Sequence, residues 1–376
     1  IMFSISNFKV EIDTTDISAM VTSMNLYESI HGNVKGTIHV EDKINFFDTF
    51  FRGLAMTQVT IGYTYFGEYL EIDMYADGVT DQVITKTGKT YNVTLSSLLN
   101  LNAAVTRICN SYSGTSNDIL TNLWKETHGQ NQLLILDTTT ASKGKYVVPN
   151  ISANECMRNV VNTAYDVNKT GMFLYQRLAD RGATRFTSIH TMVNTSFAPA
   201  GDNFAIRNEE ITVDTALGLH GTIGTANKFT LKDYNKDFIA KLAGGMWGQK
   251  ITEISLDEST NTVHNKREVT DIEITKFALS KKLYNTEVSL FAPESSVTEE
   301  IIMNMKYRLF NTNLHVDGVV AIPNIGCGMT VNVNQGGNTI SATKTDGTYL
   351  VANINHMYHM DDGVMQYSQN IGLVRE

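Results

Sequence analysis

Apolar and polar residues alternate along much of this chain, most clearly within the first hundred residues. Every second position of residues 59–65 is apolar or aromatic, and Tyr91, Val93 and Leu95 continue the same period after a polar turn at residues 86–89. A period of two is that of a β-strand with one buried face. The pattern therefore predicts antiparallel strands joined by short polar turns.

A short helix is predicted directly after Asp42. The carboxylate of Asp42 is a typical helix N-cap, and residues 43–51 place Ile44, Phe47 and Phe51 on one stripe at helical spacing. We expect this helix to cover one open end of the β unit that surrounds it.

Helical spacing replaces alternation between residues 101 and 204. The polar run that begins at Thr115 precedes an apolar stripe that Gly129 ends, which is typical of a capped helix. Ser152 followed by Glu155 is a capping box, which predicts a second helix with Gly171 at its stop. Strands are predicted at 172–178 and 184–192. This part of the chain therefore has the pattern of an inserted α/β module.

The pattern becomes strand-like again from about residue 205. A third helix is predicted over residues 296–309, where a second capping box starts at Ser296. Residues 349–360 alternate, and Asp-Gly at 362–363 predicts a hairpin turn before a last strand.

The two ends of the chain carry a similar β-rich pattern. Residues 32–42 pass from a glycine-rich turn through an alternating stretch to Asp42, and residues 244–257 repeat this order loosely and stop at Asp257. Residues 56–61 and 328–333 also correspond, because each stretch is followed by a hairpin. Such a repeat predicts that one kind of antiparallel barrel is built twice.

We therefore expect a mainly β fold with α+β insertions. The predicted division is a first barrel over 1–100, an inserted α/β module over 101–204, a second barrel over 205–260 and 310–376, and a small insertion with a helix over 261–309.

Composition agrees with a folded, soluble protein of several domains. The chain has 376 residues, of which 42% are hydrophobic and 18% charged. No apolar run approaches the roughly 20 residues of a membrane-spanning helix, and the first residues carry no secretory leader. Three distant cysteines, Cys109, Cys156 and Cys327, support neither a disulfide framework nor a thiolate metal site, so we expect buried thiols.

The charge balance bears on nucleic-acid partners. Thirty basic against 39 acidic residues give a formal charge of −9. This balance argues against a protein that grips nucleic acid through its phosphates. It is compatible with a negative surface past which DNA slides.

Motifs that could carry chemistry are weak. Residues 88–90 resemble the end of a phosphate-binding loop, but they follow a hairpin turn. His356 and His359 fall on opposite faces of a predicted strand, so they cannot hold one metal ion. Asp361 and Asp362 precede a glycine at a hairpin tip, where aspartate is common. We expect no catalytic residue, no cofactor and no metal site.

Two alternatives from other functional classes stay open. A β-rich cell-wall or carbohydrate hydrolase would use a carboxylate pair such as Glu209 and Glu210, or Asp361 and Asp362, as acid and base. A non-catalytic adhesin would bind its ligand as a monomer through aromatic residues in loops. Most aromatic residues here fall in predicted strands and helices instead.

Four phenylalanines, Phe46, Phe47, Phe50 and Phe51, crowd into six positions after Asp42. Phenylalanine is more often a core residue than a docking residue. Four of them cannot all face inward on one short helix, so at least one is expected to contact a neighbouring subunit or ring.

Both ends of the chain resemble phage tail baseplate hub proteins. The run from Tyr27 to Asp42, with residues 59–61 behind it, is similar to the opening domain of that family. Residues 323–356 are similar to the closing domain, where such a strand precedes a final hairpin. These hub proteins are similar in fold to the N-terminal part of type VI secretion spike proteins. The resemblance implies two tail-tube-type antiparallel β-barrels, with the inserted modules packed outside.

The resemblance also implies a function and a set of partners. A homotrimer of double-barrel chains presents six similar barrels, so it can join a sixfold tail tube protein to a threefold central spike protein. The ring would contact the tape-measure protein and surround a channel through which DNA passes without specific binding during ejection. The chain ends just after the second barrel, so spike and lysozyme parts would be separate proteins. Its place would be the virion tail baseplate, or a related contractile injection system, after assembly in the host cytoplasm.

Overall fold

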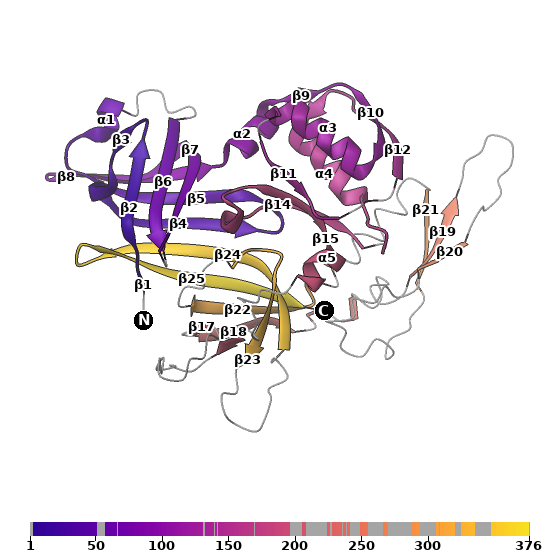
Figure 1. Ribbon diagram of the computed structural model, residues 1–376. Helices are drawn as coiled ribbons and strands as arrows, with labels where there is room; N and C mark the ends of the chain where they lie inside the picture. Colours follow the sequence, from indigo (N-terminus) through magenta and orange to yellow (C-terminus); the bar gives the residue numbers. More distant parts are fainter. Residues whose placement is uncertain are drawn as a thin grey trace.

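The structure is a computed structural model of the 376-residue chain, and it is mostly antiparallel β (Figure 1). It describes residues 3–50, 57–65, 67–130, 132–138, 140, 142–168, 170–195, 205–207, 224–225, 228–234, 236–237, 239–240, 249–254, 266–269, 288–293, 306–307, 309–319, 325–334 and 347–375. Buried apolar side chains within these ranges gather in three clusters.

Strands from the N-terminal part of the chain form a ring that closes through the C-terminal hairpin. In order around this ring, the strands are β2 (Ser6–Ile12), β6 (Thr57–Tyr65), β7 (Glu68–Thr85), β8 (Gly88–Ser96), β5 (Gly32–Asp42), β4 (Val21–Ser29), β24 (Gly347–Asp361), β25 (Val364–Arg375) and β1 (Phe3–Ser4). All these pairs are antiparallel, and β1 leads directly into β2, so the pairings return to their start. The short elements β3 (Thr15–Asp16) and η1 (Ser18–Met20) follow β2.

This ring shows why residues 1–100 alone do not make the first barrel. Alternation predicts that a segment is a strand, but it does not say which strand lies beside it. Here β4 pairs with β24, which with its partner β25 comes from the far end of the chain. The predicted alternation within the ring is confirmed, because Tyr91, Val93 and Leu95 are all buried and the turn between β7 and β8 falls at residues 86–87.

The C-terminal hairpin of β24 and β25 belongs to two cores. Its half near the turn gives the core of the ring Tyr358, Met365 and Tyr367. Its base gives a second core Tyr349, Leu350, Val351, Ile354, Ile371, Leu373 and Val374. A single long hairpin therefore stabilises both β units, since each half buries its apolar face in a different core.

The second β unit extends from the base of this hairpin. The described strands run in the order β18 (Lys228–Tyr234), β22 (Thr312–Val319), β25, β24, β23 (Thr330–Asn334), β16 (Ala205–Arg207) and β17 (Gly224–Thr225). Within the described residues, the pairings do not run on from β17 to β18.

Strand β19 (Gln249–Ile254) lies in a separate sheet with β20 (Lys266–Val269) and β21 (Val288–Pro293). Residues 249–254 therefore do not pair with the second β unit, in contrast to the predicted boundary at residue 260. The same pairing removes the correspondence between residues 32–42 and 244–257, because β5 lies inside the large sheet. Alternation and a closing aspartate describe a strand, but they do not determine its partners.

The α/β module lies beside the ring (Figure 1). Its elements are α2 (Leu98–Val105), β9 (Arg107–Ile108), β10 (Ser111–Thr115), α3 (Ser116–His128), β11 (Leu134–Leu136), β12 (Ser142–Val147), β13 (Ile151–Ser152), α4 (Ala153–Thr163), β14 (Met172–Gln176), η2 (Leu178–Asp180), β15 (Thr184–Ser188) and α5 (Ile189–Asn194). Helices α2, α3 and α4 share one core with Met172 and Phe186 of the sheet β11-β15-β14.

Two helix starts in this module agree with their sequence signals. Thr115 and Asp118 form a reciprocal capping box at α3, and Gly129 ends the helix with a φ of 78°. The Ser152 side chain accepts from the N–H of Glu155 at the start of α4. That helix ends at Thr163, well before Gly171.

Other predictions for the helices need correction. The predicted strand 184–192 is β15 followed by α5, because Ser188 caps a helix there. Helix α2, which Ser97 caps, was not predicted. Within the predicted helix 296–309, residues 306, 307 and 309 are helical. Residues 296–305 and residue 308 lie outside the described residues.

The helix after Asp42 is α1 (Phe46–Phe50). The Asp42 carboxylate accepts from the backbone N–H groups of Ile44, Phe46 and Phe47, as expected of a cap. The helix starts later than predicted and turns a different face inward, since Ile44 is 71% exposed and Phe46 is 1% exposed.

The cysteines also differ in part from the prediction. Cys156 and Cys327 are buried free thiols, as expected, whereas Cys109 is free and exposed. Cys109 directly follows the two-residue strand β9, in which Ile108 is buried and Arg107 is exposed.

Candidate functional site

A buried carboxylate joins three parts of the chain. Glu28 lies near the end of β4 and is 0% exposed. Its Oε2 accepts from the backbone N–H of Leu178 at 2.7 Å, and its Oε1 accepts from the N–H of Cys327 at 3.0 Å. Charge-assisted bonds of this kind offset the cost of burying an acid. Glu28 therefore ties the ring to the α/β module and to the segment before β23.

A buried arginine completes the link between the module and that segment. The Nε and Nη2 atoms of Arg177 donate to the carbonyl oxygen of Cys327 at 2.9 and 2.6 Å. The same guanidinium lies 3.7 Å from the carboxylate of Asp180. A Cβ on Gly326 would lie 2.5 Å from the Cδ of Arg177, so a glycine is required for this close approach.

A second set of polar groups links β24 of the hairpin to other strands of the ring. His356 on β24 lies with Nε2 3.9 Å from the Glu28 carboxylate, and its Nδ1 is 2.6 Å from the Tyr367 hydroxyl. The Tyr358 hydroxyl donates to the Tyr63 hydroxyl at 2.8 Å. Burial raises the pKa of Tyr63 to about 12 and the pKa of Tyr358 well above its ordinary value, so both hydroxyls stay neutral.

These groups hold parts of the fold together, and their geometry does not suit catalysis. Both oxygens of Glu28 are occupied by backbone N–H groups. Burial raises the pKa of the Cys327 thiol well above its usual range, which keeps it from being a thiolate nucleophile. Among the residues that the structure describes, no three His, Cys, Asp or Glu side chains are grouped to hold a metal ion.

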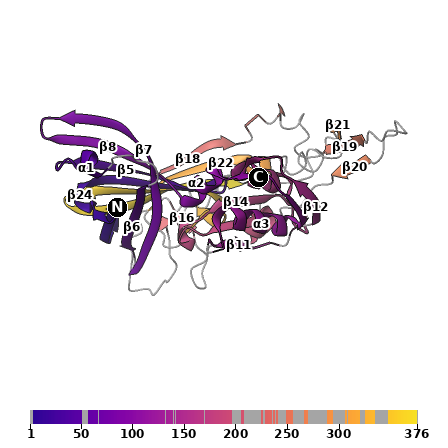
Figure 2. The ribbon, with the colours of Figure 1, turned by 90° about the horizontal axis from the view of Figure 1, so that it is seen from above.

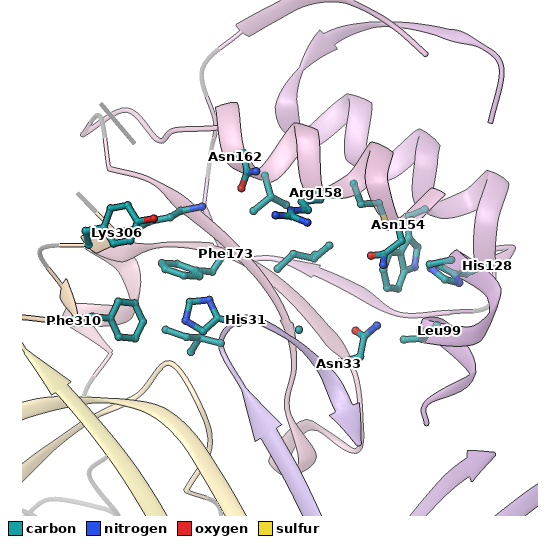
Figure 3. Close-up of a pocket in the computed structure, with 18 residues that line it drawn as sticks. His31, Asn33, Leu99, His128, Asn154, Arg158, Asn162, Phe173, Lys306 and Phe310 are labelled. Atoms are coloured by element: carbon teal, nitrogen blue, oxygen red, sulfur yellow. The ribbon is translucent and has the colours of Figure 1, made fainter. Parts of the chain in front are cut away.

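A cleft of about 590 Å³ lies beside this junction (Figure 3). Its walls are formed by the turn between β4 and β5, by helices α2, α3 and α4, by strand β14, and by Lys306, Tyr307 and Phe310. The residues that line it are Ile30, His31, Gly32, Asn33, Leu99, Ala103, Trp124, His128, Asn154, Met157, Arg158, Val161, Asn162, Phe173, Leu174, Lys306, Tyr307 and Phe310. The ring and the α/β module, two of the three parts that Glu28 joins, therefore also contribute to the cleft.

The phenylalanines that were expected to reach a neighbouring subunit lie around α1. Phe46 is in the core of the ring, and Phe47 is partly buried with its ring 5.2 Å from that of Tyr91. The side chain of Phe50 and the whole of Phe51 lie outside the described residues. A contact of this cluster with a second subunit stays a prediction.

The residues considered for chemistry do not come together. His356 is buried and His359 exposed, as expected for opposite faces of one strand. Asp361 and Asp362 are exposed at the hairpin turn, where Asp362 has a φ of 45°. Glu209 and Glu210 lie outside the described residues. Gly88 to Thr90 form the start of β8, so they make a hairpin and no phosphate-binding loop.

Sequence reasoning missed the residues of the junction. Met24, Leu26 and Glu28 lie at every second position of β4, Ile30 follows just after its end, and all four are fully buried. A carboxylate on the apolar face of a predicted strand is a sequence signal for a buried acid that needs hydrogen-bond donors from elsewhere in the fold. Arg177 carries no such signal, because its partner Cys327 is 150 positions away.

None of the helices in the described part of the chain has the length and apolar character needed to cross a bilayer. No protein-family model matches the sequence, and no curated protein sequence matches it.

Solved structures are similar over nearly the whole chain. The 43 kDa tail protein of prophage MuSo2 from Shewanella oneidensis has a TM-score of 0.62 and 13% identity, covering 98% of both chains. A tail protein from Neisseria meningitidis MC58 has a TM-score of 0.61 and 9% identity, covering 98% of this chain and 96% of that one.

A third similar structure comes from a secretion system. The E. coli c3393 protein, described as a component of the type VI secretion system, has a TM-score of 0.53 and 9% identity, covering 99% of this chain and 76% of its own. The chain therefore has the fold of these tail proteins, as the resemblance at its two ends predicted.

Proposed function

We propose that this protein is a structural hub of a phage tail baseplate or a related injection device. The observation that carries the proposal is the shared fold, which covers 98% of this chain and 98% of a prophage tail protein. The ring of strands closed by the C-terminal hairpin adds support, because such a closed β unit leaves few free strand edges and suits a rigid assembly part.

We further propose that three copies form a symmetry adaptor between a sixfold tail tube and a threefold spike. Because each chain has two β units, such a trimer would contain six β units, which matches the sixfold symmetry of a tail tube. The Glu28 and Arg177 contacts favour this role, because they fix the ring, the module and the C-terminal unit to one another. A symmetry adaptor must keep the relative orientation of these three parts constant under mechanical load.

The proposed partners are the tail tube protein, the central spike protein and the tape-measure protein. DNA would pass through the central channel without specific binding, and the formal charge of −9 favours passage over retention. The proposed place is the virion tail, and the proposed role is non-catalytic. The exposed pair Asp361 and Asp362 supports the latter, because neighbouring residues at a hairpin tip do not flank a bound sugar.

Mass photometry of the recombinant chain, alone and mixed with a candidate spike protein, tests the proposal. The expected result is a trimer that binds the spike, and cryo-electron microscopy of the complex should show a threefold ring with a central channel. A chain that stays monomeric and associates with neither spike nor tube protein would refute the proposal. Release of sugar from peptidoglycan by the purified chain would support the hydrolase instead.

A further inference from the structure

The cleft beside the junction has the size and shape of a binding site. Its volume of about 590 Å³ lies in the range typical of ligand pockets, which is about 300 to 1,000 Å³. It extends from Lys306 and Phe310 at one end to His128 at the other, with Arg158 between them (Figure 3). This length suits an extended segment better than a compact small molecule.

The ionisable groups of the cleft are all basic or neutral. His31, His128, Arg158 and Lys306 line it, and no aspartate or glutamate is among the lining residues, all of which the structure describes. The whole chain, by contrast, has 39 acidic and 30 basic residues. Burial lowers the pKa of His31 and lowers that of His128 to about 4, so both are uncharged at neutral pH. The positive charge of the cleft therefore comes from Arg158 and Lys306.

Lys306 is held against an aromatic ring and has no acidic partner within the described part of the chain. Its ammonium nitrogen lies 4.8 Å from the ring centroid of Phe173. Burial lowers the pKa of Lys306 to about 8, so the side chain is still mostly protonated at neutral pH. A partly buried cation with no acidic partner among the described residues is unfavourable, and a bound carboxylate would offset that cost.

Apolar and amide groups line the cleft together with the two cations. Phe173, Phe310 and Trp124 form aromatic walls, and the His31 ring stacks on Phe310 with centroids 5.1 Å apart. The side-chain amides of Asn33, Asn154 and Asn162 also line the cleft, and amides bind peptide backbone groups well. The chemistry that complements this lining is a carboxylate next to an aromatic or aliphatic side chain.

We propose that this cleft binds an acidic peptide segment of a partner protein, with carboxylates on Lys306 and Arg158 and an apolar side chain between Phe173 and Trp124. The occupant is a peptide because the two cations lie apart along the cleft and the amides of Asn162, Asn154 and Asn33 are also distributed along it (Figure 3). Such binding would be independent of whether the protein acts as a tail hub, since it rests on the cleft alone.

Fluorescence anisotropy with labelled peptides tests this inference on the full chain. The probe is the six-residue peptide Gly-Asp-Phe-Glu-Leu-Gly, and its neutral counterpart carries Asn and Gln in place of Asp and Glu. We expect the acidic peptide to bind at least tenfold more tightly than the neutral one, and to weaken as salt rises. Equal binding of both peptides, or no binding of either, would overturn the proposal.

Variants place the peptide in the cleft. Lys306→Met keeps most of the side-chain length and removes the charge, and Arg158→Gln removes the second charge at the mouth. Each is expected to weaken acidic-peptide binding at least fivefold, whereas the control Lys86→Met, at the exposed turn of the β7–β8 hairpin, is expected to leave it unchanged. Unchanged binding in both cleft variants would refute the site.

Hydrogen exchange gives a readout that does not depend on the variants folding. Saturating acidic peptide should slow amide exchange in α4 and in the turn between β4 and β5 of the unmodified protein. Protection confined to other elements would overturn the proposal. Benzoate is the third probe, and binding of benzoate as tight as that of the peptide would show a small-carboxylate site in place of a peptide site.

Discussion

Glu28 and Cys327 are 299 positions apart in the chain, yet the Glu28 carboxylate accepts a hydrogen bond from the Cys327 backbone N–H at 3.0 Å. The other carboxylate oxygen accepts from Leu178, so a single side chain fixes three segments. Such a contact forms only when all three parts have folded and docked. It therefore reports on the integrity of the whole arrangement.

Replacing this carboxylate should weaken the docked state. Glu28→Gln keeps the shape but leaves one of the two N–H groups facing an amide NH₂, so we expect a loss of about 1 to 3 kcal/mol in the free energy of unfolding. Urea unfolding followed by circular dichroism measures the change. The exposed Glu68→Gln, also on a strand of the ring, is the control and should change stability by less than about 0.5 kcal/mol. An equal effect of the two substitutions would contradict the role of Glu28.

The tyrosine pair between β6 and β24 should behave as a coupled unit. Tyr358→Phe leaves the buried Tyr63 hydroxyl without its donor, and Tyr63→Phe leaves the Tyr358 hydroxyl without its acceptor. Each single change is expected to cost about 1 to 2 kcal/mol, and the double change less than their sum. A double-mutant cycle from urea unfolding gives the coupling energy. Strict additivity would show that the hydroxyls do not stabilise each other.

A glycine beside Arg177 should tolerate no side chain. A Cβ at Gly326 would approach Arg177 Cδ to 2.5 Å and displace a guanidinium that is bonded to Cys327. We expect Gly326→Ala to destabilise the protein by about 1 to 3 kcal/mol. Gly32→Ala is the control, because a Cβ there meets nothing within 4 Å. Thermal unfolding of the two variants should separate them clearly, and equal midpoints would argue against the close approach.

Stability should fall in mild acid partly because of His128. Burial lowers its pKa to about 4, whereas an unfolded histidine has a pKa of about 6.5. Between these values the unfolded chain binds a proton that the folded protein does not, so the free energy of unfolding decreases as pH falls from about 6.5 to about 4. His31, whose pKa is also lowered, adds a contribution of the same sign.

His128→Gln should reduce this pH dependence. The comparison is the urea midpoint at pH 7 and at pH 5, and the drop should be smaller in the variant than in the unmodified protein. His359→Gln, at an exposed position of β24, is the matched control and should keep the full drop. If the urea midpoint of His128→Gln fell by the same amount between pH 7 and pH 5 as that of the unmodified protein, His128 would not be the source of the pH dependence.

Local signals in the sequence predicted the elements better than their partners. Thr115, Ser152 and Asp42 each cap a helix through contacts within five residues, so the local sequence contains both partners of each capping hydrogen bond. The alternation of β24 and β25 was predicted in the same way. Their places beside β4 and β1 were not, because pairing depends on segments more than 300 positions away.

The same distinction holds for the junction and the cleft. Glu28 could have been noticed as an acid on an apolar strand face, but its partners Leu178 and Cys327 contribute backbone groups that any residue type would supply. The cleft joins Lys306 to Arg158 and His31 from three distant segments. Residue type and spacing carry no record of that proximity, so a search for motifs does not find it.

The long hairpin of β7 and β8 offers a test of the proposed trimer. It projects from the rest of the molecule (Figure 2), and Ile84 near its end is 70% exposed. Val83 beside it is 54% exposed, and apolar residues that adjoin on an exposed surface mark interaction sites more often than single ones do. If this surface lies in the trimer, Ile84→Asp should shift mass photometry from trimer to monomer. The control Val167→Asp, at a residue 73% exposed in the α/β module, should leave the trimer intact. A stable trimer in both variants would show that the interface lies elsewhere, and the proposed trimer would still hold. A monomer in the unmodified protein would refute the proposed trimer.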